Sequence, residues 1–215
     1  MTAGLAPART LADRLIPARG PFATPYVRDG LLIMAGTLFM TMLARISVPL
    51  PFSPVPITGQ TLGVILLGAL YGPRLGALTL LAYLAEGLLG LPVFALGGSA
   101  WSPSRIPGLP VILGPTAGYL LAFPLAAAVV GRLAHRGWDR RVATALPAMF
   151  VGELIILALG FAWLVAATTL LSGHADVGAL LGAAVLPFLP GSVVKLTLAA
   201  LALPGGWRLL GNEAA

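Results

Sequence analysis

The chain has 215 residues, of which 58% are hydrophobic and only 9% are charged, and its mean hydropathy is +0.96. A soluble domain carries about 25% charged residues. This composition therefore excludes a soluble protein whose whole surface faces water, and it predicts a membrane protein with several spans. The net charge of +6 does not indicate a nucleic-acid partner, because the arginines stand in ones and twos between apolar segments, as in cytoplasmic loops. Cysteine is absent, which excludes disulfides, cysteine-ligated zinc and cysteine nucleophiles.

In chain order, residues 1–28 predict a cytoplasmic arm with several arginines and prolines and a short amphipathic turn around Leu11, Leu15 and Ile16. Residues 29–215 predict a single, all-α membrane domain. A spanning helix needs about 20 apolar residues. We infer six spans, the second of them short, at about 30–48, 59–72, 74–91, 115–134, 142–171 and 190–210. The apolar segment 177–188 is too short to span and is expected to be re-entrant or interfacial.

Basic residues alternate unequally between the two sides of these spans. All thirteen except Arg45, Arg105 and Lys195 fall on the side of the amino terminus. The positive-inside rule therefore predicts that both termini are cytoplasmic, which requires an even number of spans. The outward segments 47–58 and 92–115 are rich in proline, and long structured loops on one face are typical of binding or lid elements. We expect a ligand to enter there, although passive loops remain the alternative.

Lys195 is the only lysine in the chain and lies near the outward start of the sixth predicted span. An ionisable residue in a span costs about 2.5–3.5 kcal/mol to insert, so it normally has a partner or a function. Ser192 lies three residues earlier and shares its helix face. A partly desolvated ammonium suits a ligand carboxylate; the alternative is a lysine that reaches the lipid interface.

Arg45, Glu86 and Glu153 are the other ionisable residues expected inside apolar segments. Arg45 would face the same cavity or a lipid headgroup. Glu86 would accept hydrogen bonds from ligand N–H groups or neutralise Arg45. We interpret Glu153, expected nearer the cytoplasmic end of its span, as a structural or partner-contact residue. Aromatic residues near the outward ends would line an apolar pocket or form an interfacial belt, and they include Tyr83, Phe94, Tyr119 and Trp163.

No catalytic or energy-coupling motif is present in the sequence. The only lysine follows valine and precedes leucine, so there is no phosphate-binding P-loop. There is no Gly-x-Ser-x-Gly nucleophile elbow and no acidic metal constellation, and both histidines fall at predicted helix ends. These features predict that the chain is not an enzyme and holds no metal or cofactor.

Several segments together resemble one family. They are RISVPLP at 45–51, PVPITGQTL at 54–62, GPRLG at 72–76, YLAEGLLGLPVF at 83–94, LGPTAGY at 113–119, GFAWL at 160–164, and PFLPG at 187–191 followed by Lys195. This set resembles the BioY proteins, the biotin-binding S components of energy-coupling-factor (ECF) transporters, and the likeness covers nearly all of the chain after residue 30.

The resemblance implies a six-helix subunit of a bacterial inner membrane that captures biotin with high affinity beneath the first and third outward loops. Uptake would be driven by a transmembrane coupling protein and ATPase subunits. The family's Pro-Gly-Asp-x-x-Lys motif matches at Lys195, but Ser192 occupies the acidic position. Either Ser192 accepts one hydrogen bond from the ligand, or Glu86 supplies the missing carboxylate.

Together these considerations predict nine substrate-binding residues: Lys195, Ser192, Glu86, Arg45, Gln60, Tyr83, Phe94, Tyr119 and Trp163. Two alternatives remain open at this point. The chain is an S component for a different small vitamin or carboxylate, or it is a transporter that works without an ATPase.

Overall fold

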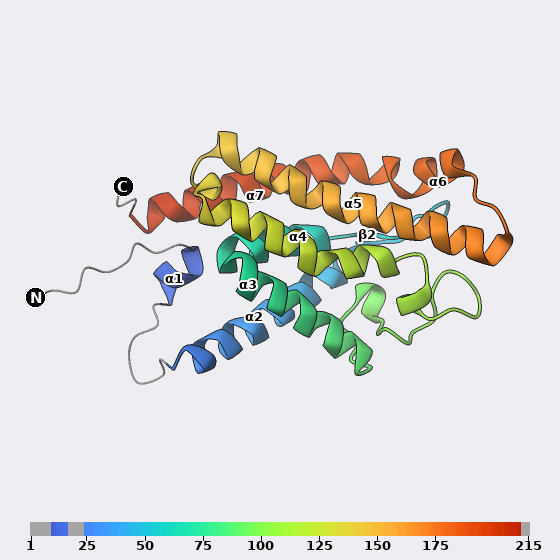
Figure 1. Ribbon diagram of the computed structural model, residues 1–215, viewed down its shortest axis with the longest axis horizontal. Helices are drawn as coiled ribbons and strands as arrows, with labels where there is room; N and C mark the ends of the chain where they lie inside the picture. The colour runs from blue at the N-terminus through green and yellow to red at the C-terminus, as the bar shows by residue number, and fades with distance from the viewer. Residues whose placement is uncertain (1–9, 17–23, 212–215) are drawn as a thin grey trace, which may run out of the picture.

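The computed structural model describes residues 10–16 and 24–211. The chain is mostly helical (Figure 1). Its α-helices are α1 (Leu11–Leu15), α2 (Pro25–Arg45), α3 (Gln60–Leu88), α4 (Ala117–His135), α5 (Val142–Ser172), α6 (Val177–Ala184) and α7 (Leu189–Leu209). The short elements are β1 (Ser47–Val48), β2 (Ile57–Thr58) and the 3₁₀ turns Ala95–Gly97, Val111–Leu113, Trp138–Arg140 and Leu186–Phe188.

Within the described residues, five helical stretches are long and apolar enough to cross a bilayer: α2, α3, α4, α5, and the stretch Val177–Leu209 that joins α6 to α7. Their outer faces carry exposed large apolar side chains, such as Met34 on α2, Phe150 on α5 and Leu198 on α7. Polar Ser192 and charged Glu153 are buried instead. Lipid is the solvent that favours this arrangement, and the chain is therefore a multi-pass membrane protein.

Helix α3 breaks and reverses direction at Gly72. This residue has φ 80° and ψ 179°, a region open essentially to glycine alone, and Pro73 follows it. The reversal brings the Gln60 amide within 2.8 Å of the Tyr83 hydroxyl. In a continuous helix these two residues would lie about 35 Å apart. The predicted segments 59–72 and 74–91 are thus the two arms of one hairpin, joined at the Tyr71-Gly72-Pro73 sequence that predicted a boundary.

The later helices match their predicted bounds within two residues, whereas α2 begins at Pro25, five residues before the expected start at 30. Proline is favoured in the first turn of a helix, where its missing N–H is not needed. Helix α4 packs most closely against α3 and α5, and α5 packs against α7 (Figure 1). The short α6 confirms that the apolar segment 177–188 does not contain a spanning helix of its own.

Helix α1 fastens the beginning of the described chain to its end. Leu11 is buried in a cluster with Leu203 and Trp207 of α7. Asp13 pairs with Arg28 of α2 at 2.8 Å, and Arg14 donates to the carbonyl oxygen of Gly211 at 3.0 Å. The predicted amphipathic turn is confirmed as a helix, although Leu15 and Ile16 are exposed. Residues 1–9 and 17–23 of the predicted arm lie outside the described residues.

Candidate ligand-binding site

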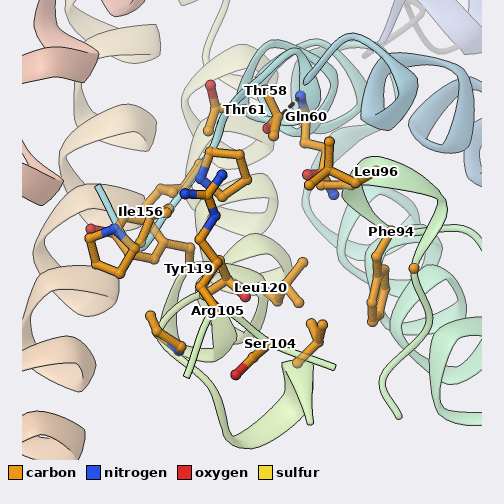
Figure 2. A pocket seen from close by; sticks show the side chains of 18 of the residues that line it. Thr58, Gln60, Thr61, Phe94, Leu96, Ser104, Arg105, Tyr119, Leu120 and Ile156 are labelled. Atoms are coloured by element: carbon orange, nitrogen blue, oxygen red, sulfur yellow. Dashed lines mark hydrogen bonds between the residues drawn. The ribbon is translucent and has the colours of Figure 1, made fainter. Parts of the chain in front are cut away.

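A cavity of about 320 Å³ lies at the end of the helices opposite α1 (Figure 2). This volume falls within the usual range of small-molecule sites. Its walls come from the loop between α2 and α3, the loop between α3 and α4, and the helices α3, α4, α5 and α7. Most of the lining is apolar and includes Phe94, Tyr119, Leu120, Phe123, Ile156 and Phe188. Among the described residues, three charged side chains line it: Arg105, Glu153 and Lys195.

Lys195 points into the protein and lines this cavity. Its side chain is only 13% exposed. The Lys195 ammonium donates to the hydroxyl of Thr61 at 2.5 Å and more weakly to the carbonyl oxygen of Thr58 at 3.4 Å. The antiparallel pairing of Thr58 with Ser47 fixes the second of these acceptors. An ammonium has three N–H donors, so one remains for a ligand.

Glu153 of α5 meets Ser192 and Lys195 of α7 at the wall of the cavity; Ser192 itself is buried behind that wall and does not line the cavity. The Ser192 hydroxyl donates to Glu153 Oε1, and Lys195 Nζ lies 4.0 Å from the same oxygen. The expected shared face of Ser192 and Lys195 is thereby confirmed. The second oxygen, Glu153 Oε2, is buried and has no hydrogen-bond partner in the described part of the chain. Of the two roles expected for Glu153, partner contact is wrong, because this side chain is buried and faces the cavity. The structural role fits its contacts with Ser192 and Lys195.

Gln60 and Phe94 also line the cavity, and Tyr83 supports both of them from behind. The Gln60 amide donates to the Tyr83 hydroxyl at 2.8 Å, and that hydroxyl donates to the carbonyl oxygen of Val93 at 2.7 Å. The rings of Tyr83 and Phe94 pack edge to face, with their centres 5.3 Å apart. Tyr83 is therefore a fully buried residue behind the wall of the cavity.

Tyr119 lines the cavity, whereas Trp163 does not. The Tyr119 hydroxyl donates to the carbonyl oxygen of Ala184 at 2.9 Å, which ties α4 to α6. Its ring lies so close to Gly160 of α5 that no larger residue fits there. The Trp163 indole donates to the carbonyl oxygen of Gly114 at 3.0 Å and so holds the loop that precedes α4.

Arg45 and Glu86 lie outside the cavity. Arg45 is exposed and donates to the carbonyl oxygen of Pro92 at 2.7 Å, which anchors the loop after α3. Glu86 is partly exposed on α3. Within residues 10–16 and 24–211 these two side chains do not form an ion pair, so the suggested neutralisation of Arg45 by Glu86 is wrong. That any of the nine residues binds substrate stays a prediction.

Arg105 is a cavity residue that the sequence did not single out. It lies in the loop between α3 and α4 and donates to the carbonyl oxygens of Leu50 at 2.8 Å and Ser53 at 3.3 Å. Figure 2 shows its side chain in the middle of the site, between Ile156 and Phe94. Arg105 thus joins the loops that follow α2 and α3. These are the first and second predicted outward loops, and the third contributes only Phe188.

Both the sequence and the fold resemble those of known proteins. The family model described as the BioY family matches residues 13–212. A biotin transporter BioY of Rhizobium etli is 35% identical over 161 residues, which cover 72% of this chain and 79% of the relative. A probable biotin transporter BioY of Pyrococcus horikoshii is 39% identical over 169 residues, which cover 79% and 88%.

One solved structure, the S-component for biotin from an ECF-type ABC transporter, superimposes with a TM-score of 0.68. The superposition covers 87% of this chain and 94% of the solved one at 24% sequence identity, so it shows a shared fold. The family model spans nearly the whole described chain, and the Pyrococcus relative is covered over most of its length. On these grounds the chain belongs to the BioY family.

Proposed function

We propose that this chain captures biotin at the outward face of the membrane and acts as the substrate-specific subunit of an ECF-type transporter. Its role is then transport and not catalysis. The names of its relatives support biotin as the ligand. The structural neighbour, an S-component, supports the transporter type.

The charge of the cavity is the observation that carries this proposal. Arg105 and Lys195 are cationic and Glu153 is anionic, so the charged lining of the described cavity sums to a single positive charge. Biotin carries one carboxylate, an apolar chain and a ureido ring with hydrogen-bond donors and an acceptor. A mostly apolar cavity with a few polar groups and one excess positive charge is complementary to such a monoanion.

The proposed topology has six membrane crossings, with the two arms of the α3 hairpin counted separately and both termini in the cytoplasm of a bacterial inner membrane. Clustering of the basic residues supports it. Arg136, Arg140 and Arg208 lie near the α1 end, while Arg45 and Arg105 lie near the cavity. The positive-inside rule assigns the arginine-rich end to the cytoplasm. The cavity then opens outward, and the coupling protein and ATPase subunits supply the energy.

Titration of biotin onto the purified, detergent-solubilised chain tests the ligand. We expect tight, saturable binding of biotin and none of comparable strength for other carboxylate vitamins tested side by side. Tighter binding of another vitamin, or no binding of biotin, contradicts the proposal.

Uptake of labelled biotin into cells that lack their own biotin transporter tests the partners. We expect accumulation when the chain is co-expressed with a coupling protein and ATPases. An uptake that is equally fast without them contradicts the assignment as an ECF subunit and supports a transporter that works alone.

A further inference from the structure

Glu153 combines three features that a purely structural carboxylate does not need. It lines the cavity, its side chain is more than nine-tenths buried, and its Oε2 atom has no hydrogen-bond partner among the described residues. Buried polar atoms in folded proteins nearly always have a partner, and a charged acceptor without one is costly. The cavity that Glu153 lines is where a molecule with an N–H or O–H donor can reach this oxygen.

The other oxygen of this carboxylate, Oε1, already has partners, so the orientation of the carboxylate is fixed and Oε2 is left for a ligand. Ser192 donates to Oε1, and the Lys195 ammonium lies 4.0 Å from the same atom. Ser192 is thus a positioning residue. Lys195 compensates the charge of Glu153 and keeps one N–H beyond its bonds to Thr61 and Thr58. A charged acceptor and a charged donor stand side by side.

A cyclic urea presents the matching pair, an N–H next to a carbonyl oxygen. Provided that the ligand is biotin, as proposed above, we infer that Glu153 is a specificity-determining residue whose Oε2 accepts the ureido N–H, while Lys195 donates to the ureido oxygen. Arg105, the lining cation without a nearby carboxylate among the described residues, then receives the carboxylate of the ligand. In this arrangement the carboxylate that binds the ureido ring comes from Glu153 on α5, which contacts Ser192 on α7.

Two ligand analogues separate these roles without any change to the protein. Methylation of the ureido nitrogen that faces Glu153 removes the N–H, so analogues methylated at either nitrogen are compared with biotin on the wild-type chain. We expect one of them to bind about 10- to 100-fold more weakly, the range for the loss of a hydrogen bond to a charged group. Equal affinity of all three ligands overturns the inference.

Glu153→Gln then assigns the effect to this side chain. We expect the variant to bind biotin about 10- to 100-fold more weakly and to lose most of the preference against the methylated analogue. Its preference for biotin over biotin methyl ester stays, because Arg105 is unchanged. Glu86→Gln is the matched comparison, since it neutralises the other acidic candidate. A loss of selectivity in Glu86→Gln and not in Glu153→Gln overturns the inference.

An exchange variant guards against a trivial folding defect. Glu153→Ser combined with Ser192→Asp moves the carboxylate across the contact while keeping one acid and one hydroxyl beside Lys195. We expect it to recover a large part of the biotin affinity that Glu153→Ser alone loses. Failure of the wild-type chain to bind biotin overturns the proposed function itself. Tight wild-type binding with unchanged affinity and selectivity in Glu153→Gln overturns only the role of Glu153.

Discussion

Replacing Lys195 by methionine removes a charge whose partner is buried, and the structure gives the size of the effect. The side chains of Lys195 and Glu153 are 13% and 4% exposed, and their charged atoms lie 4.0 Å apart. Removal of one partner from a buried pair typically destabilises a protein by about 3–5 kcal/mol, because the other charge is left uncompensated. We therefore expect Lys195→Met to lower the free energy of unfolding by about 3 kcal/mol.

The double variant Lys195→Met/Glu153→Gln removes both charges and should be more stable than Lys195→Met alone. The two substitutions are then non-additive, with a coupling of at least about 1 kcal/mol, as expected for residues in contact. Thermal unfolding of the four purified proteins in one detergent measures this coupling. A sum of the single effects equal to the double effect would refute the ion pair as a stabilising contact. The double variant should bind biotin more weakly than Glu153→Gln alone, since the proposed Lys195 contact to the ureido oxygen is lost as well.

Three further predictions concern parts of the chain away from this pair. Arg105→Ala should raise the biotin dissociation rate about 10-fold, measured by stopped-flow or ligand chase, because the two loops lose their shared cation; an unchanged rate counts against Arg105 as a cavity residue. Gly72→Ala should lower Tm and reduce the folded yield, since alanine is strained at φ 80°, whereas the control Gly182→Ala, with open space around its Cα, should be neutral. Burial raises the pKa of the Asp139 carboxyl above its ordinary value of 3.8, so the folded chain holds this proton after the unfolded chain has lost it. Stability from this residue is then greatest at low pH and declines as pH rises above about 4. Asp139→Asn keeps an acceptor for the Trp207 indole, and its Tm should gain on the wild type as pH rises; a constant difference contradicts the reasoning.

The hydrophobic pattern predicted most of the fold, because in lipid the length and composition of a segment largely decide whether it spans. The Tyr71-Gly72-Pro73 boundary, the short segment at 177–188 and the bounds of α4, α5 and α7 all follow from apolar length and from glycine and proline positions. The start of α2 was missed, because charged Arg28 and Asp29 conceal the continuity of that helix.

The site was less accessible to prediction. Lys195 could be predicted, because it is the only lysine in an arginine-rich chain and its place near the start of the last apolar segment can be read from the sequence. Glu153 lies nearer the end of α5 (Val142–Ser172) that follows Arg141, as expected, but its role was missed. Its side chain faces inward and meets Ser192 of α7, a contact that the sequence of α5 alone does not reveal. One signal in the sequence could have identified Glu153. Ser192 replaces the acidic residue of the family's motif, and Glu153 is an acidic residue within an apolar span that has no evident partner in the sequence. Arg105 was hidden because the path of its loop depends on contacts between distant segments, such as the bond to Leu50.

Helix α1 is attached to both α2 and α7, so the end of the molecule that carries α1 should unfold locally less readily than the end that carries the cavity. At one end, an ion pair, a buried leucine and a bond to the carbonyl of Gly211 clamp the first and last long helices together. At the other end, two exposed arginines hold the loops over the cavity. Arg45 donates to the carbonyl oxygen of Pro92, and Arg105 donates to that of Leu50. Local opening follows the weaker contacts. Amide hydrogens of residues 47–58 and 92–115 should therefore exchange with solvent before those of the α1 clamp, and a ligand can enter without separating the helices.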